Sequence, residues 1–193
     1  NTLVPERYGR NQVEQFANLE KKAAEQKPGE SGLLALDWNN GNRTILVDAR
    51  LSGLMVGQTL RTEAHEIYRA LLEATGFGAL RIIDRMEEYG VRVEQVINCG
   101  GLAAKNSLLM QIYADIIGRP MKVSRSEQTP ALGAAIFASV AAGVRAGGHA
   151  SVQDAQNCMV GTGKEFVPVE ENHRTYKELY RLYQQLHDAF GTP

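Results

Sequence analysis

The feature that most constrains this chain is a short strand followed at once by two glycines and a long amphipathic helix. Residues 95–99 have the composition of a strand, and Gly100-Gly101 leads into the helical region. Adjacent glycines leave no Cβ atom between the backbone and a flat ligand. The start of the following helix offers N–H groups and a positive dipole end. The pattern predicts a nucleotide site, with an ordinary tight strand-to-helix turn as the alternative reading.

Strand and helix signals alternate after this turn. Apolar residues at helical spacing occupy one face of residues 108–117, and Gly118 stands where a C-terminal cap belongs. Residues 121–123 suit a short strand. Thr129-Pro130 is typical of an N-cap followed by the first helical residue. It begins a helix of small residues, 131–142, which is suited to packing under a ligand loop or along a domain seam.

The rest of the chain also reads as alternating helices and strands. We expect a first helix over residues 13–24, a strand over 33–36 and a loop over 39–57. A second helix capped by Thr62 is expected to break near Gly76 and Gly78. The last helix carries an apolar and aromatic stripe, which indicates core packing: Tyr176, Leu179, Tyr180, Tyr183, Leu186 and Phe190.

Several of these motifs in fixed order resemble the FGGY carbohydrate kinases, and among them the ribulokinases. The order is Gly-Gly-x-Ala-x-Lys-Asn at 100–106, the stretch 111–120, Glu127, and Ala-Leu-Gly-Ala-Ala at 131–135. Residues 34–44 are similar to a loop of the same family, although Asn42 and Ile45 stand where a basic residue and a proline are expected. The resemblance runs from about residue 33 to residue 143.

The resemblance implies an α/β fold: part of an actin-like ATPase lobe of the ribonuclease H-like type, with a mixed sheet and flanking helices. It implies that residues 1–193 are the C-terminal part of the second, nucleotide-binding lobe, with no second domain in this chain. The catalytic base, the sugar contacts and a phosphate-binding turn are expected upstream of Asn1. We therefore expect the isolated chain to be inactive as a kinase.

The implied reaction is transfer of the ATP γ-phosphate to a ketopentose, with L-ribulose as the expected sugar. Mg²⁺ is the expected cofactor, held by the nucleotide and by the absent part of the protein. The expected partners are ATP, the sugar and an N-terminal lobe, and a homo-oligomer is left open. The alternatives are another FGGY kinase, for xylulose or glycerol, and a non-catalytic actin-like nucleotide-binding module.

Carried over position by position, the resemblance assigns six nucleotide-binding candidates: Gly100, Gly101, Leu102, Ala103, Lys105 and Asn106. The glycines back the adenine and ribose, and the next two residues give apolar contact. Lys105 and Asn106 are the polar candidates for contact with the base or ribose. The alternative for Lys105 is a cation that faces solvent, and the alternative for Asn106 is a polar residue at the start of a helix. Asp37 and Arg43 are favoured for loop hydrogen bonding over a role in the cleft between lobes.

Composition and the remaining motifs argue against nucleic-acid binding, membrane insertion, a cysteine metal site and a phosphate loop. A formal net charge of -1 gives no field that attracts nucleic acid or anionic lipid, and no apolar run is long enough to cross a membrane. Cys99 and Cys158 lack metal-ligand spacing and indicate reduced thiols in a cytoplasmic protein. Gly161-Thr162-Gly163-Lys164 fails as a phosphate loop, because Glu165 stands where serine or threonine is needed.

Overall fold

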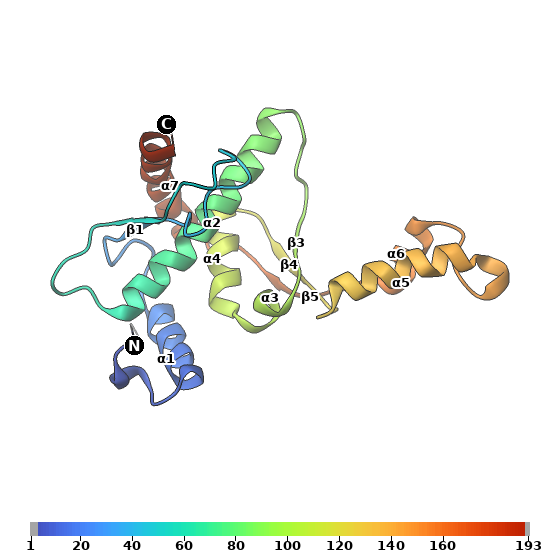
Figure 1. Ribbon diagram of the computed structural model, residues 1–193, viewed down its shortest axis with the longest axis horizontal. Coiled ribbons are helices and arrows are strands. Elements are labelled where there is room, and N and C mark those ends of the chain that lie inside the picture. Colours follow the sequence, from blue (N-terminus) through green and yellow to red (C-terminus); the bar gives the residue numbers. More distant parts are fainter. Residues whose placement is uncertain (1–3, 192–193) are drawn as a thin grey trace.

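The computed structural model describes residues 4–191, which form helices packed around one central helix and beside a small mixed sheet (Figure 1). The elements in chain order are η1 (Glu6–Tyr8), α1 (Gln12–Glu25), β1 (Leu34–Leu36), β2 (Leu54–Val56), α2 (Ala64–Glu88), β3 (Val96–Asn98), α3 (Gly101–Lys105), α4 (Ser107–Ile117), β4 (Met121–Ser124), α5 (Thr129–Ala142), η2 (Val144–Ala146), α6 (Val152–Met159), β5 (Thr162–Phe166) and α7 (Glu170–Gly191).

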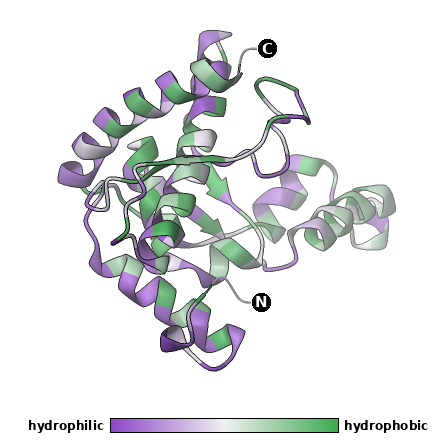
Figure 2. Cartoon of the chain, turned by 60° about the vertical axis from the view of Figure 1, so that its left-hand side comes forward, coloured by the Kyte–Doolittle hydropathy of each residue, from purple (hydrophilic) through white to green (hydrophobic). Residues whose placement is uncertain are grey.

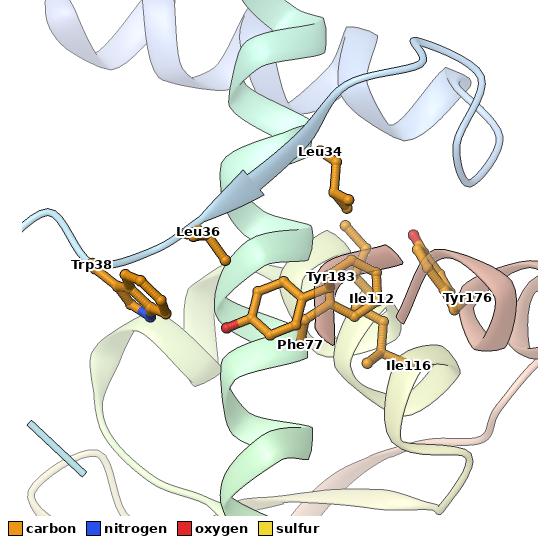
Figure 3. Packing of buried hydrophobic residues seen from close by; sticks show 8 residues of the cluster. All are labelled: Leu34, Leu36, Trp38, Phe77, Ile112, Ile116, Tyr176 and Tyr183. Carbon is orange, nitrogen blue, oxygen red and sulfur yellow. The ribbon is translucent and has the colours of Figure 1, made fainter. Parts of the chain in front are cut away.

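The main core lies where α2, α4, α7 and β1 meet (Figure 3). Phe77 of α2 is fully buried, and its ring packs at 5.3 Å from that of Tyr183 and at 6.0 Å from that of Tyr176. The prediction that the stripe packs the last helix against the core is confirmed for its other five members, whereas Phe190 is 55% exposed. The other buried members of the core are Leu34, Leu36, Trp38, Ile112 and Ile116.

Helix α2 runs without interruption through Gly76 and Gly78, so the predicted break is wrong. A Cβ at Gly76 would lie 2.7 Å from Cδ1 of Ile116 in α4, and one at Gly78 would lie 3.1 Å from Oδ2 of Asp37. The glycines let neighbouring elements approach the helix closely. Tertiary packing outweighs their cost to the helix, about 1 kcal/mol each relative to alanine. The N-cap is Glu63, in a capping box with Glu66, and not Thr62.

A buried polar network joins three helices. Arg69 Nε donates to Glu73 Oε1 at 2.8 Å, and the Tyr176 hydroxyl donates to the same oxygen at 2.8 Å. Arg69 Nη1 donates to the Ala23 carbonyl of α1 at 2.7 Å. Burial, opposed by the attraction of Arg69, raises the pKa of Glu73. Breaking such a buried pair costs about 3–5 kcal/mol, because it leaves an uncompensated charge.

Helix α7 is tied to α4 by a second buried carboxylate. Asp115 is 2% exposed and accepts hydrogen bonds from the Val169 backbone N–H and from Asn172 Nδ2, both at 2.8 Å. Its Oδ1 also accepts from Gln111 Nε2 at 2.8 Å. The carboxylate therefore binds the segment that leads into α7 and fixes where that helix begins.

Two sheets occur among the described residues. Strands β3, β4 and β5 form a mixed sheet in that order, with β3 and β4 parallel and β4 and β5 antiparallel. Helix α4 packs on it through Ala114 and Ile117, against Met121 and Phe166. Strand β1 pairs antiparallel with β2. The expectation of loop over residues 39–57 is wrong for β2, because this short strand between two glycines is defined only by its pairing with β1.

Helix α5 extends from the sheet into an arm that packs on α6 (Figure 1). Its N-cap is Gln128, one residue before the predicted Thr129. Ile136 is its one buried residue, and Phe137 is 67% exposed. Figure 2 shows that most residues of α5 are hydrophobic, whereas the rest of the arm is mixed. Helix α5 was expected to pack under a ligand loop or along a domain seam, and among the described residues its main contacts are with α6 and η2.

Two further findings concern membrane-spanning helices and the cysteines. Among residues 4–191, no helix is both long enough and apolar enough to span a membrane. Cys99 and Cys158 are free and exposed.

We predict opposite stability changes for two helical glycines. Gly76→Ala lowers the free energy of unfolding by about 1–3 kcal/mol, because the new methyl group meets Ile116. Gly133→Ala is the matched control in α5, where a Cβ meets nothing within 4 Å, and it raises that free energy by about 0.5–1 kcal/mol. Urea denaturation of both variants measures the difference. Changes of the same sign would contradict this view of α2.

Candidate functional site

The candidate site is the turn between β3 and the short helix α3. Gly100 is the N-cap of α3 and has φ 90° and ψ 172°, a conformation that L-amino acids rarely adopt. A Cβ built on Gly100 or on Gly101 meets no atom within 4 Å. Backbone conformation explains the glycine at position 100. Packing within the described residues does not explain the glycine at position 101.

The candidates after the glycines divide into exposed and buried residues. Leu102 is 67% exposed, and Lys105 is also exposed. Ala103 is 8% exposed and belongs to a cluster with Leu109, Met110 and Val123. The exposed pair is open to a ligand, whereas Ala103 anchors α3 to α4 and β4.

Asn106 holds the junction between two helices. It is the C-cap of α3 and the N-cap of α4, so the helical region after the glycines is broken at this residue. Its Oδ1 accepts from the Leu109 N–H at 2.8 Å, and its Nδ2 donates to the Tyr68 hydroxyl at 3.1 Å. The side chain is 7% exposed, and its amide groups already bind partners within the chain. Asn106 therefore has a structural role at this junction. The nucleotide contact predicted for it remains a prediction.

Two polar groups near the turn were missed by sequence reasoning. Asn98 ends β3, and its buried Nδ2 has no hydrogen-bond partner among the described residues. Lys164 lies in β5, where its Nζ donates to Ser107 Oγ at 3.0 Å and sits 5.5 Å from the Phe166 ring centroid. Only the pairing of β4 with β5 carries Lys164 to the start of α4, so no local motif could have identified it. The rejection of a phosphate loop at residues 161–164 agrees with the strand found there.

A cavity of about 580 Å³ adjoins the start of α4. Ser107, Leu108 and Gln111 of α4 line one side, and Phe166 of β5 contributes an aromatic ring. Helix α1 contributes four further lining residues, Ala17, Glu20, Lys21 and Ala24. This depression is open to solvent and is lined by both apolar and polar groups.

Comparison with known proteins assigns this arrangement to a family. The model of the FGGY family of carbohydrate kinases, C-terminal domain, matches residues 5–142. The chain belongs to the FGGY family of carbohydrate kinases. The match covers the β3 turn, α3, α4 and α5, which are the segments that carry the sequence resemblance.

Curated relatives and solved structures agree with this membership. The chain is 55% identical over 174 residues to a ribulokinase of Geobacillus thermodenitrificans, covering 90% of this chain and 31% of that protein. It is 55% identical over 180 residues to a ribulokinase of Halalkalibacterium halodurans, covering 93% and 32%. A xylulose kinase structure from Rhodospirillum rubrum superposes with a TM-score of 0.79 at 26% identity, covering 93% and 35%. The chain thus spans about a third of the length of these FGGY proteins, and its fold is the actin-like ATPase fold predicted.

Proposed function

We propose that residues 1–193 are the nucleotide-binding C-terminal portion of a kinase that transfers the ATP γ-phosphate to a ketopentose, L-ribulose. The observation that carries the proposal is 55% identity to ribulokinases along nine-tenths of the chain. The alternative within the family is a kinase for xylulose, favoured only by the structural likeness to a xylulose kinase at 26% identity.

The geometry supports adenosine binding at the β3 turn. Gly101 has free space where a side chain would stand, so the backbone is accessible to a flat base or ribose. Leu102 and Lys105 are exposed beside it. Asn106 and Ala103 fix the position of α3. These residues would bind and orient the nucleotide, and positioning is most of the catalysis in phosphoryl transfer.

The reacting groups are proposed to lie outside this chain. Among residues 4–191 no group of three or more His, Cys, Asp or Glu side chains is placed to hold a metal ion. We propose that Mg²⁺ is held by the nucleotide phosphates and by residues of the N-terminal lobe, where it would neutralise phosphate charge. The catalytic base and the sugar contacts are expected in that lobe too, so the isolated chain is expected to lack kinase activity.

The nucleotide assignment predicts a selective defect. In the full-length kinase, Gly101→Val raises the Michaelis constant for ATP about tenfold or more and leaves that for the sugar nearly unchanged, because the valine occupies space meant for the base. Gly163→Val is the control, since a Cβ at that exposed glycine of β5 meets only ordinary contacts. Steady-state kinetics with each substrate varied provides the measurement. Equal effects on both constants would point to misfolding or packing in place of nucleotide contact.

The sugar assignment has its own test. We expect the full-length kinase to show its highest kcat/KM with L-ribulose in a panel that also contains D-xylulose, ribitol and glycerol. Discrimination arises from hydroxyl partners that the wrong sugar leaves unpaired. A higher kcat/KM for xylulose or glycerol would overturn the substrate while leaving nucleotide binding intact.

A further inference from the structure

Helix α3, which carries most of the nucleotide candidates, depends on its neighbours for its position. It has five residues, and isolated helices shorter than about 12 residues are marginal in water. Its N-cap is Gly100, which has no side chain to accept from the first helical N–H groups. Ala103 is the one buried residue of α3. The orientation of the exposed Leu102 and Lys105 side chains therefore depends on what holds the C-terminal end of this helix.

Asn106 stands at that end, and one of its hydrogen bonds reaches another helix. Its backbone N–H donates to the Leu102 carbonyl at 2.9 Å, and its Oδ1 accepts from the Leu109 N–H, so both bonds stay within α3 and α4. Because Oδ1 is used for the cap, the carboxamide has one orientation, with Nδ2 toward α2. There Nδ2 donates to the Tyr68 hydroxyl. Among the described residues, Tyr68 is the one partner of Asn106 outside α3 and α4.

The surroundings of Tyr68 keep this bond in place. Burial raises the pKa of Tyr68, the bond from Asn106 opposes the change, and Glu20 of α1 adds to it. The hydroxyl is therefore neutral at physiological pH and accepts from the amide. The bond from Lys164 to Ser107 at the start of α4 differs, because both residues are exposed and water can replace either partner. Water has little access to Asn106, so loss of the Tyr68 hydroxyl would leave its amide donor unpaired.

We propose that Tyr68 is a positioning residue of the nucleotide site, which acts through the Asn106 carboxamide on the orientation of α3. This inference rests on the function proposed for the β3 turn and adds to it a residue of α2 that does not itself contact the nucleotide. Gly101 is the first residue of α3, so a tilt of the helix displaces the backbone at Gly101 as well as the exposed side chains. Misplacement of binding groups by a fraction of an ångström to an ångström weakens ligand binding.

Tyr68→Phe in the full-length kinase tests the proposal, because it removes the hydroxyl and keeps the ring. The Michaelis constant for ATP is expected to rise about three- to tenfold, the range of one hydrogen bond, while that for the sugar and kcat at saturating ATP stay nearly unchanged. Tyr180→Phe is the matched control, since it removes a hydroxyl bond between α7 and Asp84 of α2. The control is expected to lower the melting temperature and to leave the ATP constant unchanged. An unchanged ATP constant in Tyr68→Phe, or an equal rise in both constants, would overturn the proposal.

A double variant tests whether Tyr68 acts through Asn106. In the Asn106→Ala background, Tyr68→Phe is expected to cause no further rise in the ATP constant, because the hydroxyl has lost the group that it holds. Effects that multiply independently would overturn this route. Gly101→Val, measured in the same series, separates the inference from the proposed function. If Gly101→Val raises the ATP constant and Tyr68→Phe does not, the positioning role alone is overturned, and if neither variant changes it, both are overturned.

Discussion

The buried contact between Arg69, Glu73 and Tyr176 sets the position of the helices on which the rest of the structure depends. It ties α2 to α7, and the bond from Arg69 to the Ala23 carbonyl adds α1. With α2 fixed, Gly76 allows α4 to approach closely. Tyr68 on the same helix then reaches Asn106 and holds the start of α4, next to the glycine turn. The geometry of the candidate site is thus inherited from a network remote from it in sequence.

Local patterns were sufficient where a segment's structure is decided by its own residues. The β3–glycine–helix unit, the Gly118 cap and the aromatic stripe of α7 all agree with the sequence. They were insufficient where distant contacts decide. In the sequence the glycines of α2 look like helix breakers, because the close approach of Ile116 to Gly76 and of Asp37 to Gly78 is visible only in the structure. Strand β5 is exposed at four of its five positions and has no alternating pattern, so it exists through its pairing with β4.

The same distinction holds at the candidate site. The role proposed for Gly101 depends on local backbone, so sequence could suggest it, and a Cβ at this position meets no atom within 4 Å. Lys164 and Asn98 could not be identified from sequence. Strand pairing brings Lys164 to Ser107, and burial leaves the Asn98 amide without a hydrogen-bond partner among the described residues.

Hydrogen–deuterium exchange of the full-length kinase tests the central claim most directly, which is that the β3 turn is the adenosine site. Adding ATP is expected to slow exchange in a peptide spanning residues 98–106, because ligand contact and ordering protect its amides. Sugar alone is expected to leave this peptide unchanged. Peptides from the exposed arm, residues 131–142, serve as the internal control. Unchanged exchange at residues 98–106 with saturating ATP would contradict the account.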